Sequence, residues 1–279
     1  MATKKTDRDG EGQSQFIPSE KDIEDAKMYA RRRMEEQRIA MIAIEKYLLE
    51  AARRIIDIAF KYNIPPSQFQ FSENMRLKEE VDAVLQALLK SIMEEIEEAV
   101  VMASPDDDEE DRKMLLFYLY NIGDHQSVID IAIEYIERFR YELEAFIAAG
   151  LFYGLSKAAI LEEIRNNLQT PYNSELLRKA FKERVFKAVR IREKGVSFGK
   201  GQYVAAKNSI KRLLDATVGI VWWWWQTKVM KESGAEYYMQ MRGSDYPCDI
   251  CDDEAGVHPI EEIDTPYPHA HCYCIRVII

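Results

Sequence analysis

Apolar residues recur every three to four positions along most of this chain, which is the spacing that places them on one face of an α-helix. Residues 19–63 contain neither Gly nor Pro, and their apolar positions follow this spacing. The face includes Met41, Ile44, Leu48, Ala51, Ile55 and Ile58. Because proline cannot continue a helix, we expect this long helix to end before Pro65 and Pro66.

The same pattern predicts further helices after these prolines. Their expected ranges are 73–103, 105–120, 126–153, 156–168, 173–192 and 201–232. After Gly234 the sequence AEYYMQMRGSDYP favours a strand and a turn, and residues 273–279 alternate as a second strand. We therefore expect a mainly α fold, with long helices in a helical bundle, followed by a small C-terminal α+β module.

Three segments follow from these patterns. Residues 1–18 are polar and show no periodicity, which predicts a disordered N-terminal tail. Residues 19–193 form the expected helical domain, and residues 194–279 form the expected C-terminal domain. The joint KGVSFGKGQ at 194–202 matches no glycine-rich phosphate-binding pattern, so it is interpreted as a hinge.

The charge balance limits the classes of partner. The net charge is −10 and the pI is about 5.1, so a general basic surface that coats nucleic acid is excluded. Any DNA contact should be local, and the basic run KAFKERVFKAVRIREK at 179–194 is its candidate, although a solvated helix face explains the same run. No run of about 18 apolar residues and no signal peptide occurs, so we expect no membrane span and synthesis in a reducing cytoplasm.

An acidic run, SPDDDEED at 104–111, has two interpretations. It suits a cation or a basic partner. It also suits the start of a helix, with Ser104 as the N-cap, Pro105 at the first helical position and carboxylates near the positive end of the helix dipole.

Four successive tryptophans, Trp222, Trp223, Trp224 and Trp225, lie within the expected helix 201–232. Four consecutive helical residues point in all directions around the axis, so a single buried face cannot accommodate them. We expect some of these rings to bind a partner, because interfaces favour tryptophan. The alternative is a core thick enough to surround the helix.

Residues 248–274 hold all four cysteines and three of the four histidines. Cys248 and Cys251 have the C-x2-C spacing of a zinc knuckle, and His269-x2-Cys272-x-Cys274 follows after seventeen residues. This arrangement predicts a structural zinc ion that stabilises a segment too short for much core of its own. The expected ligands come from Cys248, Cys251, Cys272, His269 and Cys274, with His258 and His271 as weaker candidates. The alternative is a set of reduced thiols in a small hydrophobic fold.

The same stretch resembles a known family. A strand with Tyr237 and Tyr238, the C-x2-C knuckle, the turn DEAGV, the pattern P-x2-H-x2-C-x-C and a hydrophobic end follow one another. This order resembles the C-terminal domain of the MuF-like minor head proteins of tailed bacteriophages, also called head morphogenesis proteins. The matching positions are Cys248, Cys251, Gly256, Pro266, His269, Cys272 and Cys274, and the likeness covers about residues 200–279.

Three positions depart from the family pattern. Tyr267 and Ala270 replace prolines, which loosens a turn, and Tyr273 replaces an arginine between the last two cysteines. The third change removes a basic group, so a nucleic-acid contact made through it in relatives does not transfer to this chain.

The resemblance implies a minor structural protein of the virion, made in the host cytoplasm and located at the portal vertex of the head. It implies contact with the portal protein and other phage head proteins, and a possible contact with the packaged DNA. No catalysis is required by this role, so we expect no enzyme activity.

Two alternatives remain open. A metal-dependent HNH-like nuclease would use His258 as a general base, with Asp252 and Asp253 near a divalent ion. A zinc-stapled adaptor of non-viral origin would instead bind another protein through the tryptophans.

Overall fold

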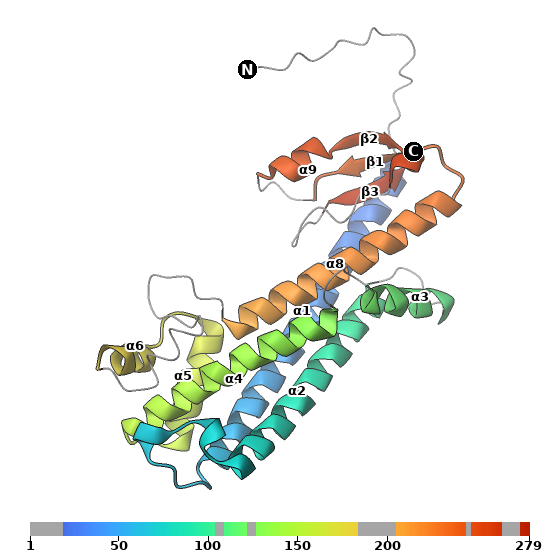
Figure 1. The fold of residues 1–279 in the computed structure, drawn as a ribbon. Coiled ribbons are helices and arrows are strands. Elements are labelled where there is room, and N and C mark those ends of the chain that lie inside the picture. Colours follow the sequence, from blue (N-terminus) through green and yellow to red (C-terminus); the bar gives the residue numbers. More distant parts are fainter. Residues whose placement is uncertain (1–18, 104–108, 122–126, 184–204, 244–246, 264–273) are drawn as a thin grey trace, which may run out of the picture. The chain divides into compact units, whose positions relative to one another are not determined.

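The computed structural model describes residues 19–103, 109–121, 127–183, 205–243, 247–263 and 274–279. The protein is mainly helical, with a small antiparallel sheet of three strands near its C-terminal end (Figure 1). It divides into two compact units, Arg32–Trp222 and the pair Met1–Arg31 with Trp223–Ile279, which we call the helical unit and the C-terminal unit. The predicted fold class, mainly α with a small C-terminal module that contains strands, is confirmed at this level.

The helices follow the predicted ranges closely. They are α1 (Glu20–Ala59), α2 (Met75–Met102), α3 (Glu109–Tyr120), α4 (Val128–Phe152), α5 (Lys157–Gln169), α6 (Glu175–Lys182) and α8 (Ala206–Glu232). Short 3-10 turns, Pro66–Gln68 and Phe71–Glu73, connect α1 to α2. Both α1 and α8 contribute residues to each of the two units.

Side-chain caps explain where several of these helices begin. The Asn74 side chain accepts a hydrogen bond from the Leu77 backbone N–H at the start of α2. Ser127 caps α4 in a capping box with Asp130, and Ser156 caps α5. Each cap satisfies N–H groups that have no partner inside the helix, which stabilises the helix by about 1 kcal/mol.

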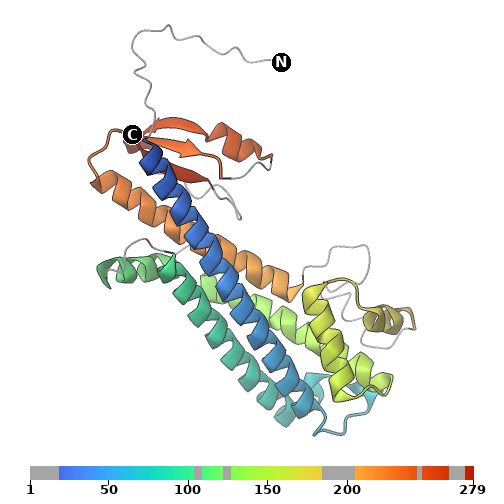
Figure 2. The ribbon, with the colours of Figure 1, turned by 180° about the vertical axis from the view of Figure 1, so that it is seen from behind.

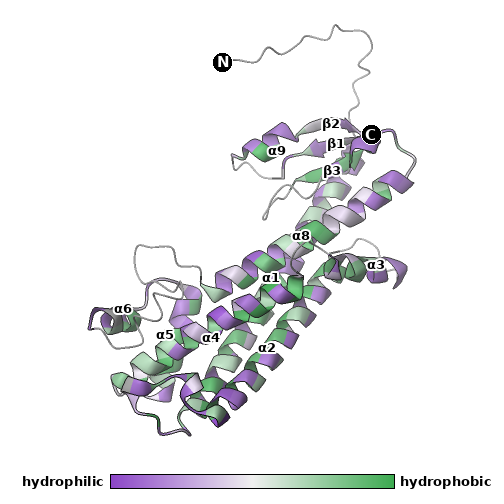
Figure 3. Cartoon of the chain, viewed as in Figure 1, coloured by the Kyte–Doolittle hydropathy of each residue, from purple (hydrophilic) through white to green (hydrophobic). Residues whose placement is uncertain are grey.

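The core of the helical unit forms along the apolar faces of its helices, which Figure 2 shows from behind. In Figure 3 these helices carry alternating green apolar and purple polar bands. Leu48 and Ile55 of α1 are fully buried, as are Phe139 and Phe146 of α4. A buried carboxylate also takes part: the Ala206 N–H at the start of α8 donates to Glu142 Oε1 at 2.8 Å. The predicted helix faces therefore provide the core, and the buried Glu142 carboxylate fixes the start of α8 within it.

The C-terminal unit contains the sheet. Its elements are β1 (Tyr237–Met241), the one-turn helix α9 (Asp249–Asp253), β2 (Gly256–Pro259), a 3-10 turn (Ile260–Glu262) and β3 (Ile275–Ile278). The strand order is β2-β1-β3, and both pairings are antiparallel. Gly234, with φ of 74°, follows α8, in the left-handed conformation that commonly ends a helix.

Several sequence-based predictions fall on residues outside the described ranges. These are the tail 1–18, Ser104 with Pro105, the later part of the helix 173–192, and the boundary at 193–194. Strand β2 and helix α9 are additions that the hydrophobic pattern did not predict, because both are too short to show a period. Within the described residues, no helix combines the length and apolar character that crossing a membrane requires.

Candidate functional site

The knuckle cysteines occupy the one-turn helix α9. Cys248 is its N-cap residue, and the Asp252 N–H donates to the Cys248 carbonyl at 2.9 Å. Cys251 is buried within the turn, and Cys274 is buried immediately before β3. Three of the five predicted zinc ligands therefore belong to the same small unit.

The metal prediction depends partly on residues that the structure does not describe. His269 and Cys272 lie in the range 264–273, outside the described residues, and so does His271. Among the residues that are described, no group of three or more His, Cys, Asp or Glu side chains is placed to hold a metal ion. A thiolate-rich set fits zinc chemically, and zinc binding stays a prediction.

A basic group lies beside the knuckle. Arg242, just after β1, donates to Asp252 in α9. This hydrogen bond and the negative charge of Asp252 raise the pKa of Arg242. Arg242 therefore remains a cation beside the knuckle.

His258, the candidate base of the nuclease alternative, lies on β2. Its Nε2–H donates to the Glu254 carbonyl at 3.0 Å. Its ring stacks on Tyr238, with ring centroids 5.3 Å apart and planes inclined by 28°. Of the acids named with it, Asp252 is engaged by Arg242, and Asp253 is exposed.

The four tryptophans differ in exposure. Trp222, Trp223 and Trp225 are 2%, 1% and 5% exposed, whereas Trp224 is half-buried. The Arg33 guanidinium lies 4.7 Å from the Trp222 ring centroid. Trp222, Trp223 and Trp225 are therefore core rings, and Trp224 is the ring with partial exposure. Partner binding by the four tryptophans stays a prediction.

Arg276 on β3 is a structural residue that the sequence analysis did not single out. It is 2% exposed, and its guanidinium carbon lies 3.6 Å from the Trp223 ring centroid and 5.3 Å from that of Tyr238. It also donates to Thr227 Oγ1 at 3.0 Å and to Gln240 Oε1 at 3.4 Å. One signal in the sequence was available: Arg276 is the single charged residue in the otherwise apolar run CIRVII.

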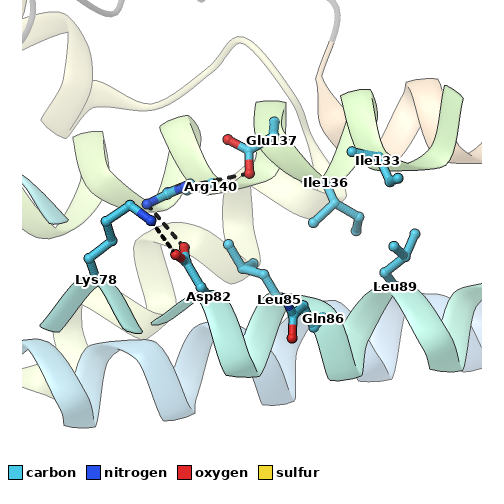
Figure 4. Close-up of a pocket in the computed structure, with 9 residues that line it drawn as sticks. All are labelled: Lys78, Asp82, Leu85, Gln86, Leu89, Ile133, Ile136, Glu137 and Arg140. Carbon is cyan, nitrogen blue, oxygen red and sulfur yellow. Dashed lines mark hydrogen bonds and ion pairs between the residues drawn. The ribbon is translucent and has the colours of Figure 1, made fainter. Parts of the chain in front are cut away.

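The helical unit has an open groove of about 430 Å³ between α2 and α4 (Figure 4). One part of the groove is apolar and is lined by Leu85, Leu89, Ile133 and Ile136. Ile133 is 44% exposed, so the groove presents an aliphatic surface to solvent. This surface suits an apolar side chain rather than a polar ligand.

The other part of the groove is charged but internally balanced. Asp82 pairs with Lys78 at 2.5 Å and with Arg140 at 3.1 Å. Arg140 also pairs with Glu137 at 3.5 Å. Figure 4 shows these groups converging at one side of the groove. Two cations and two carboxylates leave no net charge there to select a charged ligand.

Comparisons with known proteins add no assignment. The family resemblance rests on the residues of the C-terminal unit, whose order along the chain is β1, knuckle, β2 and β3. No protein-family model matches the chain, and neither a curated protein nor a solved structure was found to be similar to it.

Proposed function

We propose that this chain is a minor structural protein of a phage head, associated with the portal vertex and acting in head assembly and DNA packaging. One observation carries the proposal: the Cys/His pattern that resembles the MuF-like domain occurs with its knuckle in a turn between two paired strands. Cys248 and Cys251 lie between β1 and β2, and Cys274 lies at the start of β3. The arrangement supports a small stapled module rather than a dispersed set of thiols.

The proposal includes a structural zinc ion held by ligands from Cys248, Cys251, His269, Cys272 and Cys274. Small apolar clusters in the C-terminal unit support it. One holds Ala26, Ala30, Ile275 and Val277, and the other holds Met230, Tyr238, Ile260 and Ile263. Because each of these clusters among the described residues is small, a metal ion would add folding free energy to that of packing.

The proposed partners are the portal protein and other head proteins. Trp224 supports this choice because a half-buried tryptophan keeps an apolar surface near solvent, as interface residues do. Proposed contact with packaged DNA would be local, since the chain carries a net charge of −10. In this role the protein is made in the host cytoplasm and is found in the virion.

The experiment is co-expression of the chain with the portal and capsid proteins encoded beside it, followed by sedimentation of the assembled heads. We expect the chain to sediment with heads that contain portal and to be absent from heads assembled without it. Trp224→Ala should reduce this incorporation, whereas the matched change Phe117→Ala, at an exposed ring on α3, should leave it unchanged. A chain encoded away from any portal gene and absent from heads would refute the proposal.

A further inference from the structure

The two faces of the C-terminal sheet are covered unequally. Successive residues of a strand point to opposite faces. On one face Tyr238 packs with Met230 of α8, and Arg276 lies over Trp223 of the same helix. These contacts bury that face, as the alternating burial along β1 shows, with Tyr238 and Gln240 buried and their neighbours only half-buried.

On the opposite face, the packing seen among the described residues is at β3. Ile275 and Val277 are buried there against Ala26 and Ala30 at the beginning of α1. A helix is about 10 Å wide and strands lie about 4.8 Å apart, so one helix covers about two strands. The third strand, β2, therefore lies beyond the reach of α1 on this face.

Exposure rises across this face in the expected direction. The register aligns Val277 of β3, Met239 of β1 and Val257 of β2 in one row. Val277 is 3% exposed, Met239 is half-buried, and Val257 is 42% exposed. Tyr237, beside Met239 on the same face, is also half-buried. We call Met239 and Val257 the open sheet face.

The C-terminal run that forms the open sheet face is net acidic. Residues 233–279 contain nine acidic and two basic residues, which is seven of the ten net negative charges of the chain. Of the two basic residues, Arg276 is buried and Arg242 is paired with Asp252. Residues 1–31 and 223–232, which complete the C-terminal unit, contain eight acidic and eight basic residues, so the net charge of the unit is −7.

Acidic side chains flank β2 at both ends. Asp253 and Glu254 lie three and two residues before the strand, and Glu261 and Glu262 lie two and three residues after it. Asp253, Glu261 and Glu262 are exposed. A partner that covers β2 would bring its own groups close to these carboxylates at both ends.

We propose that the open sheet face binds a basic and apolar segment of a protein partner, with aliphatic side chains over Val257 and Met239 and Lys or Arg near the flanking carboxylates. The charge favours a basic segment over nucleic acid as the occupant, because phosphates would meet the carboxylates that flank β2. This surface goes beyond the proposed head role and does not depend on it.

The contact is made through side chains rather than by adding a strand. The Ile260 N–H donates to the Glu236 carbonyl at 2.9 Å. Backbone N–H and C=O groups alternate in direction along an antiparallel strand, so those of Val257 and Pro259 point away from β1. Proline has no N–H, so the outer edge of β2 lacks a donor that strand addition needs.

The test measures binding of the full chain to a labelled synthetic peptide in which lysine alternates with leucine, by fluorescence anisotropy at low salt. Val257→Ser should weaken binding about fivefold, the loss expected for one half-buried aliphatic contact. The matched change Val229→Ser, on α8 at 38% exposure, should leave binding unchanged. Glu261→Gln with Glu262→Gln should weaken binding about tenfold, and this loss should shrink as salt rises.

Comparison probes decide the class of partner. A peptide with glutamate in place of lysine, a peptide with serine in place of leucine and a short DNA duplex should each bind at least about tenfold more weakly. Equal binding of any of them, or equal effects of Val257→Ser and Val229→Ser, would overturn the proposal. So would a rise in peptide affinity on deletion of residues 1–18, because the occupant would then be the chain's own N-terminal segment. If Val257→Ser alters the circular dichroism, the closer isostere Val257→Thr takes its place.

Discussion

Trp223 and Trp224 are neighbours on α8, and the structure predicts opposite consequences for their removal. Trp223 is 1% exposed and packs under the Arg276 guanidinium at 3.6 Å, whereas Trp224 is half-buried. Trp223→Ala should therefore unfold or loosen the C-terminal unit. Trp224→Ala should leave the fold intact and reduce partner binding.

The magnitudes separate the two variants clearly. Removing a fully buried tryptophan costs about 3–5 kcal/mol. The buried cation-π contact of Trp223 with Arg276 adds about 2 kcal/mol, so Trp223→Ala should cost at least about 5 kcal/mol. For Trp224, loss of partial burial should cost about 1–2 kcal/mol. At about 2 kcal/mol per molar urea, the two transition midpoints should differ by about 1 M or more.

Urea denaturation of the full chain measures this difference. All four tryptophans lie at 222–225, so tryptophan fluorescence reports on this part of α8, and far-ultraviolet circular dichroism reports on helix content as a whole. Incorporation into portal-containing heads supplies the functional readout. Equal midpoints for the two variants, or a larger loss for Trp224→Ala, would refute the assignment of Trp223 to the core and Trp224 to the surface.

Three further predictions address the metal, the nuclease alternative and helix packing. The purified protein should contain about one zinc ion per chain by metal analysis, and protein without zinc would contradict this. The double change Cys248→Ser with Cys251→Ser should release the metal and unfold the end of the chain, while the helical circular dichroism persists. Plasmid DNA incubated with Mg²⁺ should remain uncut, and nicking that disappears in His258→Ala would instead establish the nuclease. A Cβ at Gly150 of α4 would lie 2.4 Å from Ile160 Cγ1, so Gly150→Ala should lower the free energy of unfolding by about 1–2 kcal/mol in urea denaturation. In an Ile160→Ala background, where this clash is absent, the same change should raise it by about 1 kcal/mol. Stabilisation in both backgrounds would show that α4 and α5 do not pack this closely.

The helices could be predicted from the sequence because their apolar period extends over several turns. The predicted range 126–153 became α4, Val128–Phe152, and 156–168 became α5, Lys157–Gln169. Their starts were marked locally by Ser127 and Ser156, whose side chains cap the helices. Such signals depend on neighbours in the chain and need no tertiary contact.

The short elements of the C-terminal unit could not be predicted in this way. Strand β2 has four residues, Gly256–Pro259, and exists because its backbone pairs with β1. Helix α9 has five residues and begins at a cysteine. Segments this short have too few positions for a hydrophobic period, so pairing and local contacts decide their conformation.

The sequence by itself determined the long helices, the strands β1 and β3, the acidic balance and the cysteine spacing on which the family resemblance rests. Each of these is a property of residue types at fixed separations along the chain. Only the tertiary structure decided which tryptophans are buried, that Arg276 stacks on Trp223, and that one face of the sheet stays open over β2. Burial depends on which elements pack together, and residues separated by some fifty positions, such as Trp223 and Arg276, meet only when the chain folds.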